Sequence, residues 1–296
     1  MLCRTTDSML SGLGGVGDMP EINFDEVVEP AIVGVNRAVV FMGLGVTAAS
    51  ESAVANYRLP EAPHIDLIPQ VTEEQLAEFK REFGVWIIGN GLRELVETWD
   101  VFLDRLYIVS LASDEWRAER AGEALRPGHY AKRARAFPKR GTGEKFDLLQ
   151  TEFGIRLTFE AEIESIKKAR NCLTHRLGVV GAKDLNSPGG LAVRWRAPEL
   201  FGYHEDGSEF VPSLDAFPIE FPTGSPVKLR HGERQKIVPR GHRLQLSAAE
   251  LKEICYTFRI AIMQAQESFA GSIARIGGTV NQPAKSSHGV GTGRET

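Results

Sequence analysis

Apolar residues recur at helical spacing over most of the chain, which predicts a mainly α fold. The first predicted helix covers about 25–57, with a break near Pro30. The second begins at Thr72, which forms a capping-box pattern with Gln75, and its aromatic positions are assigned to the core without a ligand. Glycines at 89 and 91 should permit a kink before this helix continues to about residue 106.

Shorter helices are predicted further along the chain. Ser113 is placed as the N-cap of a helix over 114–125, and a helix over 146–153 ends at Gly154. The residues between 132 and 145 are predicted to form a basic turn rather than a packed element. The next helix, with apolar positions from residue 155 to residue 173, ends at Gly178.

The pattern changes between residues 179 and 245, where short β-prone pieces such as 191–195 and 217–221 replace the helical periods. Ser247 and Glu250 then form a second capping box, which begins a final helix reaching about residue 276. We predict a multi-helix bundle with a β-rich insertion before its last helix. The predicted regions are a flexible leader (1–19), a helical domain (20–178 with 246–276), the insertion (179–245) and a disordered tail (277–296).

Composition adds that the protein is globular and carries local charge. The 296 residues are 42% hydrophobic, and the net charge is −4. Two runs depart from this balance: residues 117–145 hold nine Lys or Arg against three Glu, and residues 228–243 hold six against one. Either basic run can meet an anion.

Three cysteines, at positions 3, 172 and 255, form neither an even disulfide set nor a metal-ligand spacing, which indicates a reducing, cytoplasmic compartment. Histidines 204, 231 and 242 lack ligand spacing and are expected on the surface, so no metal or other cofactor is predicted. The apolar stretch 31–50 is interrupted by Asn36 and Arg37, which favours a buried helix over a membrane span.

The densest group of reactive polar residues lies at 167–178, in the last turns of a predicted buried helix. Asn171 and His175 are four residues apart and therefore share one helix face. Arg170 lies one step round the helix and can reach the same place through its long side chain.

Arg170 and His175 bracket four residues, and the residue after the arginine is polar. This motif, within the run ARNCLTHRLGVV, resembles the HEPN family, the higher eukaryotes and prokaryotes nucleotide-binding domains. The resemblance implies an all-α bundle, frequent dimerisation and, in many members, metal-independent ribonuclease activity in toxin–antitoxin or phage-defence systems. It therefore implies RNA, a second copy of the chain and an antitoxin protein as partners. No membrane is predicted as a partner, because Asn36 and Arg37 interrupt the apolar stretch 31–50.

The residue types fit that activity. RNA cleavage without a metal needs a base, an acid and positive charge at the phosphate, and imidazole, with a reference pKa near 6.5, can serve as either base or acid. Arg170 would neutralise the scissile phosphate, Asn171 would orient the imidazole or donate to the phosphate, and two copies of His175 in a dimer would supply both proton-transfer roles. Additional substrate contacts are assigned to Lys139, Arg140, Lys167 and Arg176.

Three other interpretations stay open at this point. Arg170 and His175 can cap carbonyls at the helix C-terminus, where the helix dipole favours cations. Cys172, three residues before His175, is expected to be a buried structural thiol rather than a nucleophile. The whole domain can also be a non-catalytic module that binds RNA, a nucleotide or a partner protein.

Overall fold

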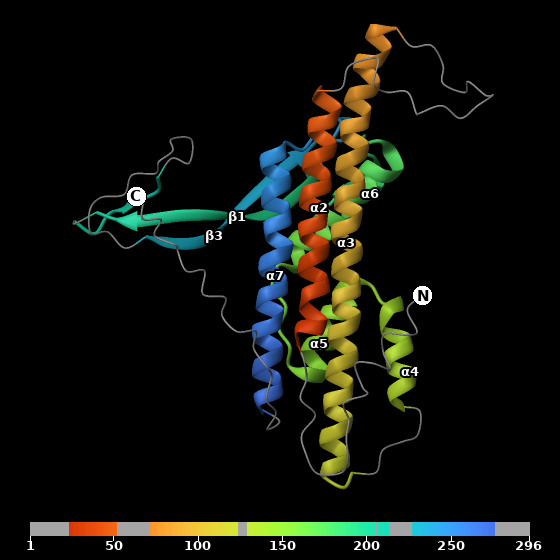
Figure 1. Cartoon of the computed structure of the whole chain (residues 1–296), viewed down its shortest axis with the longest axis vertical. Helices are drawn as coiled ribbons and strands as arrows, with labels where there is room; N and C mark the ends of the chain where they lie inside the picture. The colour runs from red at the N-terminus through yellow and green to blue at the C-terminus, as the bar shows by residue number, and fades with distance from the viewer. Residues whose placement is uncertain (1–23, 52–71, 124–128, 205, 213–226, 276–296) are drawn as a thin grey trace, which may run out of the picture. The chain divides into compact units, whose positions relative to one another are not determined.

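A computed structural model describes residues 24–51, 72–123, 129–204, 206–212 and 227–275, and it has a mainly α fold (Figure 1). The described part contains one three-stranded antiparallel sheet, which precedes the last helix as predicted. The helices are α2 (Asp25–Glu51), α3 (Glu73–Arg120), α4 (His129–Ala136), α5 (Thr142–Phe153), α6 (Glu160–Arg176) and α7 (Ala248–Arg275).

The chain divides into two compact units. Unit 1 comprises Met1–Ala31, Phe102–Arg156 and Ala265–Thr296, and unit 2 comprises Ile32–Val101 and Leu157–Gln264. Helices α2, α3 and α7 each contribute to both units. The β-rich segment and the end of α6 therefore belong to unit 2, and α4 and α5 belong to unit 1.

In unit 2, α2 and α3 form an antiparallel helix pair. A Cβ atom on Gly34 would lie 2.5 Å from Thr98 Oγ1, so only glycine allows this close approach. Nearer the other end of the pair, Gly45 faces Ile87. Arg37 forms an ion pair with Glu94 on α3, which explains how α2 carries a charge within its apolar stretch.

Helix α6 also runs antiparallel to α3. Near the end of α6, a Cβ atom added to Gly89 of α3 would lie 3.3 Å from Leu173. Six residues earlier on α6, Lys167 Nζ lies 3.6 Å from Asp100 Oδ1 of α3. The buried face of α6 repeats at helical spacing and consists of Ile163, Ile166, Ala169, Cys172 and Leu173.

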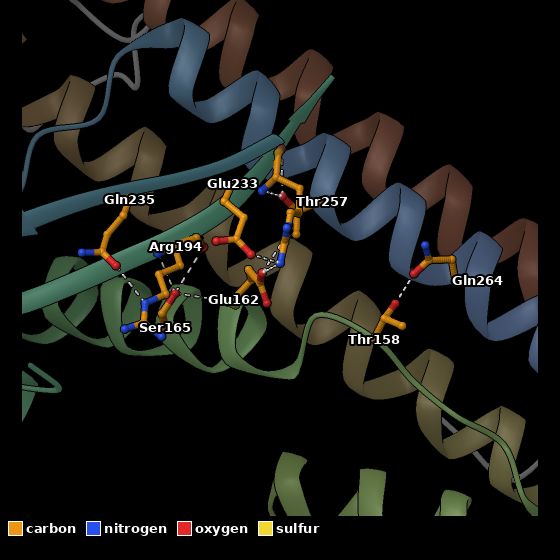
Figure 2. A network of polar contacts seen from close by, with 9 residues as sticks. Thr158, Glu162, Ser165, Arg194, Glu233, Gln235, Thr257 and Gln264 are labelled. Carbon is orange, nitrogen blue, oxygen red and sulfur yellow. Dashed lines mark hydrogen bonds and ion pairs between the residues drawn. The ribbon is translucent and has the colours of Figure 1, made fainter. Parts of the chain in front are cut away.

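The sheet contacts α6 and α7 through one strand, in which the Arg194 amide donates to Ser165 Oγ on α6 and the Arg196 amide donates to Thr257 Oγ1 on α7. Strand β1 (Leu191–Tyr203) pairs along its length with β3 (Lys228–Val238) and, at its end, with the short β2 (Glu209–Phe210). Figure 2 shows the polar contacts that join β1 to the two helices. The predicted strand 191–195 is confirmed and is longer than expected, and the predicted strand 217–221 lies outside the described residues.

A polar and aromatic group holds unit 1 together. Tyr107 stacks on Phe137 with ring centroids 3.8 Å apart and donates a hydrogen bond of 2.7 Å to Glu152. Burial, together with this carboxylate, raises the pKa of Tyr107 to about 12. Nearby, Lys145 is buried and its ammonium lies 2.7 Å from Asp104.

Both predicted capping boxes are present, because Thr72 exchanges hydrogen bonds with Gln75 and Ser247 exchanges them with Glu250. The left-handed φ of 67° at Gly154 confirms that it ends α5. Ser113 is not an N-cap, because it lies inside α3 and donates to the carbonyl of Val109.

The predicted basic turn at 132–145 is wrong in its structure, because most of it is helical. Residues 132–136 belong to α4, Phe137–Lys139 form the 3-10 helix η2, and α5 begins at Thr142. The sequence did not reveal these helices because Phe137 is the one buried apolar residue within 132–139, and one residue makes no helical periodicity.

The predicted first helix is also corrected. Helix α2 continues through Pro30 without a break, and residues 52–57 of the prediction lie outside the described residues. By length and composition alone, α2 is long and apolar enough to span a membrane. Within the protein, 28% of its most apolar window is buried. The expectation of a buried helix therefore holds for one face only.

Candidate functional site

The C-terminal end of α6 is closed by two left-handed residues. Leu177 has φ 50° and Gly178 has φ 82°, and the Gly178 amide donates to the carbonyl of Cys172 over 3.1 Å. The chain is then fastened to the segment before α7, since Leu244 donates to the Gly178 carbonyl over 2.7 Å and Val180 donates to the His242 carbonyl over 3.0 Å. The end of α6 is thus a fixed platform.

The three predicted catalytic residues lie on this platform. Asn171 and His175 are exposed, one turn apart on α6, and Arg170 is half-buried beside them. Arg170 Nη1 donates to Asn171 Oδ1 over 2.9 Å. The buried Nε of Arg170 has no hydrogen-bond partner among the described residues.

The geometry argues against capping as the role of these cations. Backbone amides already bind the carbonyls of Cys172 and Arg176 at the helix end. In the described part of the chain, no side-chain hydrogen bond from Arg170 or His175 reaches a helix-end carbonyl, and the Arg170 bond goes to Asn171. His175 presents an imidazole to solvent with no intramolecular hydrogen bond to any described residue.

Two cations assigned to substrate have protein partners instead. Arg176 makes a bidentate contact with Asp184, whose carboxylate also accepts from the Gly181 amide over 2.8 Å. Asp184 is 2% exposed, so this pair fastens the turn after α6. Lys167 lies 3.6 Å from Asp100 on α3.

The other two, Lys139 and Arg140, belong to unit 1 and line an open groove of about 400 Å³ on α4 and η2. Arg140 lies 3.3 Å from Glu144. Lys132, Arg135 and Lys139 have no ion-pair partner among the described residues. The sequence pattern included these cations but not their arrangement round a groove.

The second basic run differs, because β3 is largely neutralised. Arg230 contacts both Glu199 and Glu209, Arg234 contacts Glu199 at 2.7 Å, and Lys236 contacts a carboxylate on α7 at 2.8 Å. The arginines hold the pKa of Glu199 below its ordinary value. The β3 part of this run is therefore a structural charge network on the sheet, and Arg243 lies outside that network.

A pocket of about 180 Å³ lies between α3 and the end of α6. Trp86, Asn90 and Arg93 line it from α3, and Leu173 and Thr174 line it from α6. Leu177, directly after α6, and Arg243, in the segment before α7, complete the lining. Sequence reasoning missed this site because it assigned the aromatic residues of α3 to the core. Trp99 is buried as expected, but Phe79, Phe83 and Trp86 are exposed.

The remaining candidates behave as structural groups. Cys172 is fully buried, and burial raises the pKa of its thiol to about 11, so it carries little thiolate at neutral pH. Histidines 204, 231 and 242 are exposed, as expected. Within the described residues, no three His, Cys, Asp or Glu side chains gather in a way that could hold a metal ion.

Comparison with known proteins adds no relative: no family model, no curated protein and no solved structure matches this chain.

Proposed function

We propose that this protein is a metal-independent endoribonuclease of HEPN type. The observation that carries the proposal is the exposed end of α6, where His175 has no hydrogen bond to a described residue and Asn171 and Arg170 lie beside it. Such a grouping contributes little to stability, since Asn171 and His175 face solvent and the buried Nε of Arg170 lacks the partner that buried polar groups normally have. Its arginine is suited to a negatively charged ligand, and its imidazole is suited to a ligand that gives up or takes a proton.

In the proposed mechanism, the 2′-hydroxyl of RNA attacks the neighbouring phosphorus. One His175 accepts the hydroxyl proton, and the leaving 5′-oxygen receives a proton from a second imidazole. Arg170 would exchange its contact with Asn171 for the phosphate oxygens, because a charge-assisted bond to phosphate is stronger than a bond to a neutral amide. The products are a 2′,3′-cyclic phosphate and a 5′-hydroxyl.

A homodimer would supply the second imidazole, and an exposed apolar stripe on α2 supports such a dimer. Val33, Val40, Phe41 and Leu44 repeat along this helix, and Phe41 and Leu44 are 62% and 66% exposed. These residues and the motif belong to the same unit. Because a contiguous exposed apolar surface is costly in water, a second copy of the stripe is the proposed cover.

The test is incubation of purified protein with RNA in EDTA, beside the His175→Ala variant. We expect cleavage by the native protein alone, with cyclic phosphate ends, and resistance of an RNA that carries 2′-O-methyl at the scissile nucleotide. Cleavage of that RNA, or of DNA, would point to a water nucleophile and overturn the proposed chemistry.

The dimer is tested by Leu44→Arg, with Val179→Arg as a matched control, because Val179 is an exposed valine outside α2. Leu44→Arg should give a monomer in sedimentation and lose activity, and the control should stay dimeric. If the α2 stripe instead binds lipid vesicles and the native protein is monomeric, the dimer proposal fails.

A second candidate is a non-catalytic module that binds RNA, a nucleotide or a partner protein. The buried Nε of Arg170 favours it, because a bound ligand or partner protein would complete the hydrogen bonding of this atom without any cleavage. RNA binding without cleavage would select this alternative. A toxin or defence role, with an antitoxin protein as partner and a cytoplasmic location, belongs to the proposal on the family resemblance alone.

A further inference from the structure

The pocket between α3 and α6 adjoins the motif through α6 itself. Thr174 and Leu177 line it: Thr174 lies on the helix face of Arg170, four positions later, and Leu177 is the first residue after the helix. Thr174 also directly precedes His175. A ligand bound at the motif would therefore have the pocket within one or two helical turns.

Trp86 gives the pocket an uncovered aromatic wall. It is 61% exposed, although a tryptophan exposes this much apolar area only at a cost in water. Its ring is stacked with Phe83 at a centroid distance of 5.8 Å and an interplanar angle of 15°, which limits its orientations. An oriented aromatic plane is the surface on which proteins stack unpaired nucleobases.

Asn90 adds a polar group of known direction. Its Nδ2 donates to the backbone carbonyl of Trp86 over 2.8 Å, and because that partner can only accept, the amide cannot be reversed. Oδ1 has no hydrogen-bond partner among the described residues. It is thus ready to accept from an exocyclic amino group of a base.

Positive charge lies on both sides of the aromatic wall. Arg93 lines the pocket from α3 and has only a loose contact of 3.6 Å with Glu97. Arg243 lines it from the opposite segment and has no ion-pair partner within the described residues. Among the described residues that line the pocket, Glu82 is the one carboxylate. A base that enters would therefore carry its backbone phosphates past cations.

We propose that this pocket binds an RNA nucleobase next to the scissile phosphate and prefers adenine. Trp86 stacks on the base. Asn90 accepts from the N6 amino group and offers its second amide hydrogen to N7, the pairing that asparagine makes with adenine. Arg243 and Arg93 hold the flanking phosphates. The inference rests on the proposed function for the position of the scissile phosphate, but binding of the base does not require cleavage.

The experiment measures binding apart from chemistry. Short oligoadenylate and oligouridylate RNAs are titrated into the full-length His175→Ala protein and followed by fluorescence anisotropy. Oligoadenylate should bind more tightly, and adding Trp86→Ala should weaken its binding on the order of ten- to hundred-fold, the range found for loss of one stacked base. Trp86→Phe should restore most of the loss.

Phe79→Ala is the matched control, because Phe79 is an exposed aromatic residue two turns earlier on α3 and does not line the pocket. It should leave binding unchanged. Asn90→Ala should remove the preference for adenine while retaining part of the affinity. Equal losses for Phe79→Ala and Trp86→Ala would overturn the proposal, as would a Trp86→Ala protein that binds RNA normally or a dimer that dissociates on loss of Trp86.

The two proposals fail in different ways. If the native protein cleaves RNA and Trp86→Ala changes neither affinity nor cleavage preference, the base pocket is wrong and the ribonuclease stands. If no RNA is cleaved but oligoadenylate binds through Trp86, the ribonuclease is wrong and the pocket stands.

Discussion

The two halves of α6 use polar side chains in opposite ways. In its first turns Glu162 is buried and accepts a 2.7 Å hydrogen bond from Arg196 Nε on β1, and Ser165 Oγ accepts one of 2.8 Å from the Arg194 amide (Figure 2). In its last turns Asn171 and His175 are exposed, and Arg170 keeps an unsatisfied buried Nε.

The difference separates polar groups that stabilise the fold from polar groups that are available to a ligand. The Glu162 network extends to the exposed Glu233 on β3 and, through the Arg196 amide and Thr257 Oγ1, to α7. Each buried polar atom there has a partner, as a stable core requires. At the end of α6, the exposed imidazole of His175 and the buried Nε of Arg170 have no hydrogen-bond partner among the described residues, so both are available to a ligand.

The largest expected effect is on chemistry at the exposed end. Replacing His175 or Arg170 by alanine should lower RNA cleavage about 10²- to 10⁴-fold, the usual range for a lost acid, base or charge-stabilising group. Helical circular dichroism and the melting temperature should hardly change. Cleavage rates at saturating RNA and thermal melts provide the check, with His204→Ala, an exposed histidine on the same unit, as the control. Unfolding of both variants would indicate that the motif stabilises the fold and does not carry the chemistry.

The reverse result is expected at the other half. Glu162→Ala leaves the Arg196 guanidinium with the exposed Glu233 as its remaining carboxylate partner among the described residues, and breaking such a largely buried pair costs about 3 kcal/mol of unfolding free energy. Denaturant melts measure this cost. Glu233→Ala is the matched control, since Glu233 contacts the same arginine but is 78% exposed, and it should change stability little. A stable Glu162→Ala protein with impaired cleavage would erase the distinction between the two halves.

A smaller loss of activity is expected for Asn171→Ala. Asn171 touches Arg170 over 2.9 Å and shares its face with His175, so its amide positions groups that carry the proton and charge. We expect a loss of about 10- to 100-fold at saturating substrate, less than for His175→Ala. Asn171→Asp, which keeps the oxygen but adds a negative charge, should be worse than alanine. Full activity of Asn171→Ala would remove this residue from the site.

Sequence reasoning reached the mainly α fold and the β-rich insertion because local signals set both. Thr72 with Gln75 and Ser247 with Glu250 form their capping boxes between near neighbours, so their patterns are visible in the sequence. Ser113 failed as a cap because the packing of α3 overrides a local preference, and the serine instead bonds back to Val109.

The candidate site was reached only in part, for the same physical reason. Arg170, Asn171 and His175 are close in sequence, and helix geometry alone places them together. Trp86 and Arg243 meet the end of α6 through long-range packing, which no periodicity reveals. The Arg176 contact with Asp184 was likewise invisible, because it depends on the turn after α6.

The smallest expected effect concerns the two basic runs, whose similar charge in the sequence conceals different environments. Lys139 has no ion-pair partner in the described part of the chain, whereas Glu199 neutralises Arg230 and Arg234. Each phosphate neutralised on single-stranded RNA adds roughly 0.7 to the slope of log affinity against log salt. Replacing Lys139 and Arg140 by alanine should therefore weaken RNA binding and flatten that slope by about one unit, with cleavage at saturating RNA unchanged.

The matched control for this double variant is Arg230→Ala with Arg234→Ala, which removes the same charge from a neutralised site. Its salt slope should stay close to that of the native protein, because those arginines already have carboxylates in place of phosphates. Anisotropy titrations across a salt series on the His175→Ala background measure both slopes. An unchanged slope for the Lys139 and Arg140 variant would make the groove on α4 and η2 a solvated surface, and an equal drop in both would mean that RNA binding responds to net charge alone.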